Sequence, residues 1–268
     1  MSEQAPRANK ELGQHYLKDK SVIEKIVTDF SSEAQAIIEV GPGPATLTRD
    51  LAALGLPFYV VERDERFLPL LGEFLKAEQI VHADALAIDW EEFISTREDL
   101  RGKKVWLVSN LPYNISAPLT INFVKSGAIT FMSLMYQLEV GRKIAPTQGE
   151  SNTMNSLLAL CQTYYQVKSL CKVAPGAFSP PPQVQSVVLS FSRIEAPRFE
   201  LSQWRELEKF LRLAFSQKRK QLAGVLKASY ALPRIKECLE ELNLPATVRS
   251  EALSLEQIQS LYAKLVLR

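Results

Sequence analysis

The stretch AIIEVGPGPATL, residues 36–47, decides the fold. Its first half is a short apolar run of the kind that forms a buried β-strand, and GPGP follows at once. Glycines at positions 41 and 43 allow the backbone to turn tightly and to approach a ligand. Residues 46–54 then show helical spacing of apolar side chains. The stretch therefore predicts a strand, a glycine turn and a helix, the first βα unit of a sheet. A plain β–α turn without a ligand remains the alternative.

Strand-like and helical patterns continue to alternate along the chain. Helical patterns occupy residues 19–30, 64–76 and 117–125, and strand-like runs lie between them. Such alternation predicts βαβ units, and nearly continuous apolar strands are typical of a parallel sheet with helices on both faces. We therefore expect an α/β fold with a Rossmann-like sheet. The runs are FYVVE (58–62), QIVHAD (79–84), KVWLVSN (104–110) and ITFMSLMYQ (129–137), with two later strands at 164–173 and 185–191 around the loop PGAFSPPP.

The chain changes character near Pro197. From residue 201 onward only helical patterns occur, at 201–215, 219–230, 232–242 and 255–267. We predict two domains, residues 1–197 and a small all-α domain of residues 198–268. The second holds 13 Lys and Arg against 8 Asp and Glu, a net charge of +5, which leaves −3 for residues 1–197. This asymmetry indicates contact with a polyanion, although an ordinary solvated helix surface would look the same.

Composition excludes several classes of protein. The three cysteines form no CxxC pair, and with only two histidines a zinc site is improbable, so no metal is predicted. This cysteine usage fits a reduced, cytoplasmic setting. No run of about 18 apolar residues is present, so no membrane span is expected. The first ten residues, MSEQAPRANK, lack the apolar core of a secretion signal.

Acidic residues stand at the ends of successive predicted strands. Glu62 ends the second strand, 21 residues after Gly41, where a carboxylate can accept both ribose hydroxyls. Asp84 ends the third, where it can accept a hydrogen from an adenine amino group. A dinucleotide site would require G-x-G-x-x-G, and Thr46 stands at the last position. The pattern predicts an adenosine ligand without a pyrophosphate, namely S-adenosylmethionine. Alone, Glu62 could be a surface acid and Asp84 a helix cap.

The fourth strand ends in SNLPYNIS, residues 109–116, which suggests chemistry on an exocyclic amine. The side-chain oxygen of Asn110 and the carbonyl of Leu111 can accept the two amine hydrogens, while Pro112 fixes where that carbonyl points. Tyr113 offers a face on which a base can stack. Methyl transfer would then depend mainly on positioning the amine in line with the methyl donor. In the alternative reading, Asn110 caps a helix and Pro-Tyr is a turn.

With these motifs, the chain resembles the ribosomal RNA adenine N6-dimethyltransferase family nearly end to end. A single motif of this kind would be weak evidence, whereas seven in the same order are specific. The segments that carry the resemblance are LGQHYL (12–17), EVGPGPATLT (39–48), VVERDERF (60–67), HADAL (82–86), NLPYNIS (110–116), PGAFSPPPQVQSVV (175–188) and AFSQKRKQL (214–222).

The resemblance implies a class I methyltransferase fold, S-adenosylmethionine as cofactor, and a helical domain that recognises rRNA. Within the family, the chain is most similar to the housekeeping branch, which dimethylates two adjacent adenosines in the 3′-terminal hairpin loop of 16S rRNA. The implied partner is the 30S subunit or its precursor, in ribosome biogenesis, with the enzyme a monomer. Phe178 would stack on the opposite face of the target adenine, or be a core residue. The implied cofactor residues are Gln14, His15, Leu17, Gly41, Gly43, Glu62, Asp84 and Asn110.

Some positions depart from the family pattern. His15 and Tyr16 replace the usual Asn and Phe, so the side chain at the His15 cofactor contact differs from that of the family, and EVGRK (139–143) replaces E-V-A-E-R. Three other functions stay open: a 23S rRNA adenine methyltransferase of the macrolide-resistance type, a non-catalytic assembly factor with this fold, and a small-molecule methyltransferase. The basic residues expected to contact RNA phosphates, or else to be solvated helix charges, are Arg142, Lys143, Lys218, Arg219 and Lys220.

Overall fold

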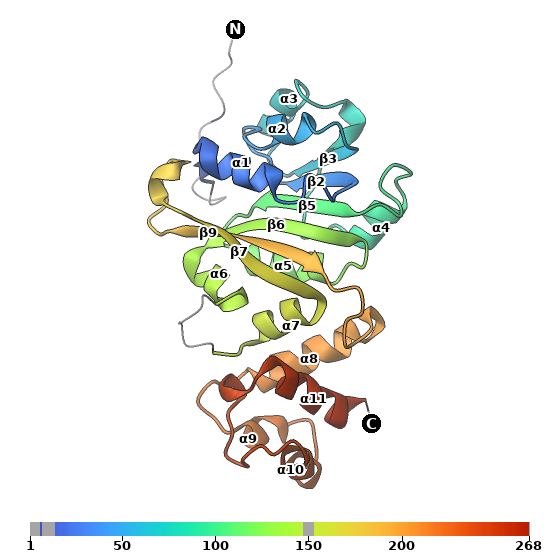
Figure 1. The fold of residues 1–268 in the computed structure, drawn as a ribbon, viewed down its shortest axis with the longest axis vertical. Coiled ribbons are helices and arrows are strands. Elements are labelled where there is room, and N and C mark those ends of the chain that lie inside the picture. Colours follow the sequence, from blue (N-terminus) through green and yellow to red (C-terminus); the bar gives the residue numbers. More distant parts are fainter. Residues whose placement is uncertain (1–5, 7–13, 147–152, 268) are drawn as a thin grey trace. The chain divides into compact units, whose positions relative to one another are not determined.

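A computed structural model describes residue 6, residues 14–146 and residues 153–267 of the chain. It divides into two compact units (Figure 1). The sheet unit comprises residues 1–145 and 166–193, and the helical unit comprises residues 146–165 and 194–268. The sequence predicts a domain boundary after residue 197, whereas the second segment of the helical unit begins at residue 194. The predicted boundary would place α7 (Ser156–Tyr164) in the first domain, because a helical pattern alone does not indicate which core the helix joins.

The sheet unit is built on a seven-stranded sheet in the order β4-β3-β2-β5-β6-β9-β7. Neighbouring strands from β4 to β6 pair in parallel, as expected, whereas β9 pairs antiparallel to β6. β2 and β3 are buried along their whole length, which explains their unbroken apolar sequence. The strands are β2 (Ala36–Val40), β3 (Phe58–Glu62), β4 (Ile80–His82), β5 (Val105–Asn110), β6 (Ile129–Gln137), β7 (Tyr165–Val173) and β9 (Ser186–Arg193).

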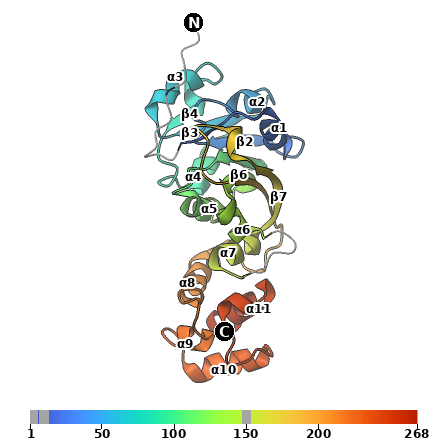
Figure 2. The same cartoon turned by 90° about the vertical axis from the view of Figure 1, so that its left-hand side faces the viewer.

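Helices cover both faces of this sheet (Figures 1 and 2). On one face, α1 (Lys20–Thr28), α2 (Thr48–Ala52) and α3 (Leu68–Leu71) pack on a shared apolar core with β2, β3 and β5. The other face carries α4 (Trp90–Ser95) and α5 (Ser116–Val124), whose Trp90 and Phe123 rings meet edge to face at 5.4 Å. α6 (Leu138–Ile144) follows β6 directly. The predicted α/β fold with helices on both faces of the sheet is therefore confirmed.

A second, two-stranded sheet was not predicted. β1 (Tyr16–Leu17) pairs antiparallel with β8 (Phe178–Ser179), and the Lys18 N–H donates to the Ala177 carbonyl at 2.8 Å. Two residues are too few to show an alternating pattern, so sequence periodicity could not reveal this pairing. Its consequence is large, because it attaches the N-terminal segment (residues 14–17) beside the end of β5.

The helical unit contains α7 (Ser156–Tyr164), α8 (Trp204–Ala214), α9 (Leu222–Leu226), α10 (Leu232–Glu241) and α11 (Leu255–Val266). α8 buries Trp204, Leu207, Leu211 and Ala214 at helical spacing, and this stripe faces the core of the unit. None of the helices in the described part of the chain is long and apolar enough to cross a membrane.

Three predicted helices are shorter than expected. The pattern at 46–54 yields only α2, residues Thr48–Ala52. The pattern at 64–76 yields a 3-10 turn (Glu65–Phe67) and a single α-helical turn, α3, because Pro69 and Gly72 interrupt the run. In the helical unit, α9 begins only at Leu222, whose N–H donates to the Val248 carbonyl at 2.8 Å. The preceding residues of the predicted helix at 219–230 instead form an exposed turn.

Candidate active site

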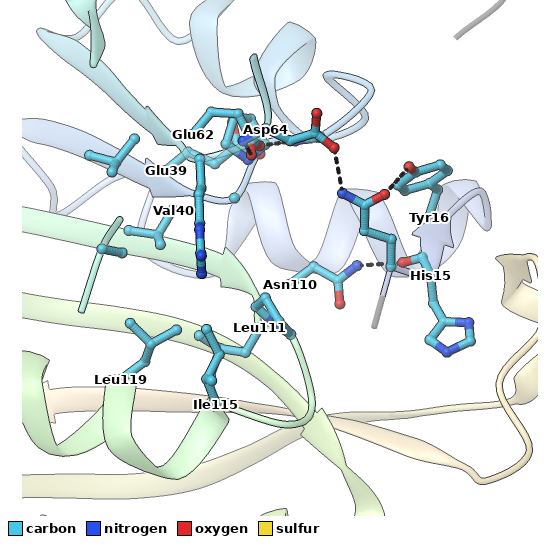
Figure 3. A pocket seen from close by; sticks show the side chains of 18 of the residues that line it. His15, Tyr16, Glu39, Val40, Glu62, Asp64, Asn110, Leu111, Ile115 and Leu119 are labelled. Atoms are coloured by element: carbon cyan, nitrogen blue, oxygen red, sulfur yellow. Dashed lines mark hydrogen bonds between the residues drawn. The ribbon is translucent and has the colours of Figure 1, made fainter. Parts of the chain in front are cut away.

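A cavity lies at the carboxyl ends of β2, β3, β4 and β5, with the N-terminal segment along one side (Figure 3). Parallel strands end at the same edge, so their terminal residues converge there. The cavity gathers all eight residues expected to bind the cofactor, together with three more from the NLPY motif. They are Gln14, His15, Leu17, Gly41, Gly43, Glu62, Asp84, Asn110, Leu111, Pro112 and Tyr113.

The glycine turn forms the cavity wall after β2. Gly41 and Gly43 have φ angles of +68° and +52°, in the left-handed region that favours glycine. A Cβ at Gly43 would meet the Tyr16 ring only at an ordinary contact distance of 3.6 Å, so the positive φ, and not lack of space, is what favours glycine here. The turn therefore presents bare backbone to the cavity, as the sequence predicted.

Glu62 ties the end of β3 to the glycine turn. Its carboxylate accepts from the Gly43 N–H at 3.0 Å and from the Asp64 N–H at 2.7 Å. Burial raises the pKa of this carboxyl, and the backbone N–H groups oppose that rise. Each carboxylate oxygen retains further acceptor capacity, so the group can also accept from hydroxyls of a ligand.

Asp84 occupies the loop after β4 and is about one third exposed at its side chain. Its carboxylate accepts from the Leu86 N–H at 3.0 Å, a bond within the same turn. This bond resembles the capping role that was the alternative interpretation of Asp84. The other oxygen pairs with the exposed Arg63 at 3.2 Å. The residue nevertheless lines the cavity, so the turn bond and a ligand contact are compatible.

Glu39 is a carboxyl group in the cavity wall that was not among the predicted site residues. It is 2% exposed on β2, and its carboxylate accepts from the Thr48 hydroxyl at 2.7 Å. Burial raises its pKa to about 8, and the neighbouring charge of Glu62 adds to the rise. A protonated Glu39 can donate a hydrogen bond inside the cavity. The sequence feature that points to Glu39 as a site residue is its position near the end of the first strand, immediately before Val40 and the glycine turn.

Asp64 is a carboxylate near the cavity that the sequence patterns did not single out. It lies two residues after Glu62, and the Gln14 amide donates to it at 3.0 Å. The Tyr16 hydroxyl in turn donates to Gln14 at 2.7 Å. The Arg66 guanidinium is the main reason that the pKa of Asp64 falls to about 2. Asp64 is therefore a fixed negative charge that holds the N-terminal segment at the cavity.

The amide of Asn110 is fixed by the N-terminal segment. Its Nδ2–H group donates to the backbone carbonyl of His15 at 2.9 Å (Figure 3). A rotated amide would bring two oxygens together, so this bond sets the orientation of the group. The side-chain oxygen then points away from His15 and accepts no hydrogen bond within the described chain. The arrangement leaves an acceptor at the strand end where the sequence predicted one.

Tyr113 is held at both ends. Its ring stacks on that of His15, with centroids 5.6 Å apart and planes 26° apart. Its hydroxyl bonds to the Ser186 hydroxyl at 2.7 Å, and burial raises its pKa. His15 Nδ1–H donates to the Pro180 carbonyl at 2.9 Å. The histidine thus joins the NLPY motif to the loop before β9. The sequence shows only that His15 differs from the usual Asn, and does not indicate these contacts.

Phe178 does not line the cavity. Its side chain is 1% exposed and belongs to the apolar core beneath the sheet, paired in register with Leu17. This is the core reading that the sequence left open for Phe178. Stacking on a target base would require its ring to leave that core, so the expected role has no support in the observed geometry.

The predicted RNA-contacting residues are exposed in both units. Arg142 and Lys143 lie on α6, where Lys143 pairs with Glu139 at 2.7 Å. Lys218, Arg219 and Lys220 lie in the turn between α8 and α9. Exposure is necessary for a phosphate contact but is equally expected of solvated charges. Among the described residues, no cluster of three or more His, Cys, Asp or Glu side chains could hold a metal ion.

The fold and the cavity together define a class I methyltransferase. Two solved structures share the fold: a dimethyladenosine transferase from Plasmodium falciparum (22% identity, TM-score 0.72, covering 92% of this chain and 96% of that one) and the 23S rRNA methyltransferase ErmE (22%, 0.68, 93% and 99%). The profile of the ribosomal RNA adenine dimethylase family matches residues 5–265. The chain belongs to that family.

Curated relatives agree over nearly the whole length. A protein named ribosomal RNA small subunit methyltransferase A from Bdellovibrio bacteriovorus is 35% identical over 262 residues, covering 95% of this chain and 91% of the relative. The protein of the same name from Pseudomonas aeruginosa is 35% identical over 254 residues, with 93% and 91% covered. The resemblance read from the sequence motifs is therefore confirmed.

Proposed function

We propose that this chain transfers methyl groups from S-adenosylmethionine to the N6 amines of two adjacent adenosines in the 3′-terminal hairpin loop of 16S rRNA, giving N6,N6-dimethyladenosine at both. The observation that carries the proposal is the amide of Asn110. Its nitrogen is bonded to the His15 carbonyl, and its oxygen is left as an acceptor at the cavity edge. An acceptor is what an exocyclic amine requires during methylation.

The donors and acceptors of the cavity fit the proposed cofactor. Backbone free of side chains at Gly41 and Gly43, the carboxylate of Glu62 and that of Asp84 follow one another around the edge of the sheet. They match an amino-acid moiety, a ribose and an adenine in turn. When bound, the cofactor supplies a methyl carbon activated by its sulfonium. These residues and Gln14 would hold it.

The chain's own residues then act on the target amine. In the first transfer, the oxygen of Asn110 and the carbonyl of Leu111 accept the two N6 hydrogens, which draws the nitrogen lone pair out of the ring. In the second transfer, one of them accepts the single hydrogen that remains. Pro112 restricts the backbone at Leu111 and so fixes that carbonyl. Tyr113, fixed by Ser186 and His15, gives the base a rigid surface. Catalysis is mainly positioning, because the ammonium group formed by methyl transfer is acidic enough to lose its proton to water.

The names of the relatives support the substrate. The two curated relatives are small-subunit rRNA methyltransferases, whereas the 23S enzyme is similar only in fold, at 22% identity. Exposed Lys218, Arg219 and Lys220 in the helical unit and Arg142 and Lys143 on α6 would contact phosphates and position the RNA. A base in a loop is easier to move out of its stack than one in a duplex. The partner would be the 30S subunit or its precursor.

Methyl incorporation tests this function. Purified protein, radiolabelled S-adenosylmethionine and 30S particles lacking these methyl groups should give up to four methyl groups per particle, and mass spectrometry of rRNA fragments should place them on two adjacent adenosines. Parallel reactions would contain 50S particles or free adenosine. Label in 50S particles would instead support the 23S activity, and label in free adenosine would support a small-molecule enzyme. Cofactor binding without label in any substrate would support an assembly factor.

A further inference from the structure

One face of α5 lies under the cavity and carries a buried amide. The helix begins three residues after Tyr113, so it continues directly from the NLPY motif. Ile115, Leu119 and Asn122 follow one another at helical spacing and share a face. The first two line the cavity (Figure 3), whereas Asn122 lies one turn further along and is 7% exposed. A buried amide requires hydrogen-bond partners, which makes its contacts informative.

The partners of Asn122 are backbone carbonyls of a single loop. Its Nδ2 atom lies 3.2 Å from the Ala85 oxygen, 3.2 Å from the Ile88 oxygen and 3.5 Å from the Leu86 oxygen. An amide nitrogen has two hydrogens, so the two shorter contacts satisfy it. The three carbonyls belong to the connection between β4 and α4. This connection also carries Asp84, the acid expected to meet the adenine amino group.

The rest of the loop is held less firmly. Asp84 bonds to the N–H of Leu86 within the same loop, and its pair with Arg63 is exposed, which limits its strength. At the strand side, the Ala83 N–H donates to the Glu62 carbonyl at 3.0 Å. Asn122 supplies a buried attachment at the opposite side, on the helix. The loop is therefore fixed between β3 and α5, with Asp84 and Ala85 facing the cavity.

We propose that Asn122 is a positioning residue for cofactor recognition. By holding the carbonyls of Ala85 and Ile88, it places Asp84 where its carboxylate can discriminate adenine from a base without the amino group. The proposal rests on the proposed function, because it takes an adenosine cofactor as the ligand. The competing account is that Asn122 only stabilises the fold. The two accounts differ in whether base preference, rather than stability, changes when the amide is lost.

The test compares two ligands by calorimetry: S-adenosylhomocysteine, and the same molecule with hypoxanthine in place of adenine. The wild type should prefer the adenine form. Asn122→Leu removes the donor and should raise the Kd for the adenine form about tenfold, the scale of one hydrogen bond. It should leave the Kd for the hypoxanthine form within about twofold, so the preference falls. Asn122→Met, whose flexible side chain adapts to irregular packing, replaces it if the leucine variant does not fold.

Thr120→Val is the matched control. Thr120 is fully buried on the same helix, and its hydroxyl bonds to Ser116 and Tyr136, away from the loop. It should lower the thermal midpoint without changing the preference. An unchanged preference in the Asn122 variants, or an equal loss in Thr120→Val, would overturn the proposal. The wild-type methylation assay decides the proposed function separately, so RNA inactivity with intact adenine preference would leave the role of Asn122 standing.

Discussion

The Asn110 amide and the His15 carbonyl are joined by a 2.9 Å hydrogen bond between residues 95 positions apart in sequence. The residue expected to receive the target amine is thus oriented by the N-terminal segment, which is distant in sequence but lies beside the end of β5. Because the bond uses the amide nitrogen, it determines which atom of Asn110 remains for a substrate. Docking of the N-terminal segment and the orientation of the Asn110 oxygen toward a substrate are therefore linked.

Asn110→Asp tests this orientation. The variant keeps the shape of the side chain but places a carboxylate oxygen against the His15 carbonyl, which repels it. We expect kcat for methyl transfer to fall by at least about 100-fold, the scale for losing one preorganised polar group at a reacting centre. Single-turnover methylation at saturating cofactor measures this, with the Kd of S-adenosylhomocysteine as control. A variant with wild-type kcat would show that the amide orientation does not matter.

His15 variants separate its two side-chain contacts. His15→Ala loses the stack on Tyr113 and the bond to the Pro180 carbonyl, and we expect kcat to fall about tenfold. His15→Phe keeps a ring on Tyr113 and should recover part of that loss. Steady-state methylation measures both. Equal kcat values for the two variants would mean that the stack does not position Tyr113.

Glu39→Gln should remove a pH dependence of stability. The pKa of Glu39 rises from 4.5 to about 8 on folding, so between these values the unfolded chain loses the proton that the folded chain keeps. The free energy of unfolding of the wild type should fall as pH rises through this window, by on the order of a few kcal/mol. Glutamine can still accept from Thr48 but does not titrate. Urea unfolding at pH 5 and pH 8.5 gives the difference between the proteins, and a difference independent of pH would contradict the assignment.

Gly141→Ala should destabilise the sheet unit. A Cβ at Gly141 on α6 would overlap Cγ1 of Val187 on β9. We expect a loss of about 1–3 kcal/mol from this overpacking, larger than the roughly 1 kcal/mol that alanine gains in a helix. Urea unfolding measures it. Adding Val187→Ala should recover part of the loss, and strictly additive effects of the two substitutions would show that the overlap is relieved elsewhere.

Replacing Lys218, Arg219 and Lys220 by glutamine should weaken RNA binding in a salt-dependent way. If all three contact phosphates, the slope of log Kd against log salt should fall by about 2 to 3. The control is the triple glutamine variant of Arg101, Lys103 and Lys104, exposed residues of the sheet unit with the same total charge. Equal slopes for both triple variants would mean that net charge, and not a specific contact, governs binding.

Much of the sheet and of the cofactor edge could be predicted from the sequence, because those features rest on local patterns. The runs at 36–40 and 58–62 are buried strands, and Glu62 and Asp84 meet at the same edge as the glycine turn. The contacts around His15 could not be predicted, since they join residues with no shared periodicity. Phe178 shows the same limit, because the sequence pattern of a phenylalanine between prolines is the same whether the ring packs in the core or lines a binding site.

The pairing of β1 with β8 also has a consequence for the order in which the site forms during synthesis. His15 meets Pro180 across 165 positions, and Tyr16 meets Ser179 in the two-stranded sheet. A nascent chain that has emerged only as far as α5 already contains the glycine turn, both acids and Asn110. It still lacks β8, the strand partner that attaches residues 14–17. Gln14 and His15 can then already bond to Asp64 and Asn110, whereas the contacts of His15 with Pro180 and of Tyr16 with Ser179 must wait for the later segment.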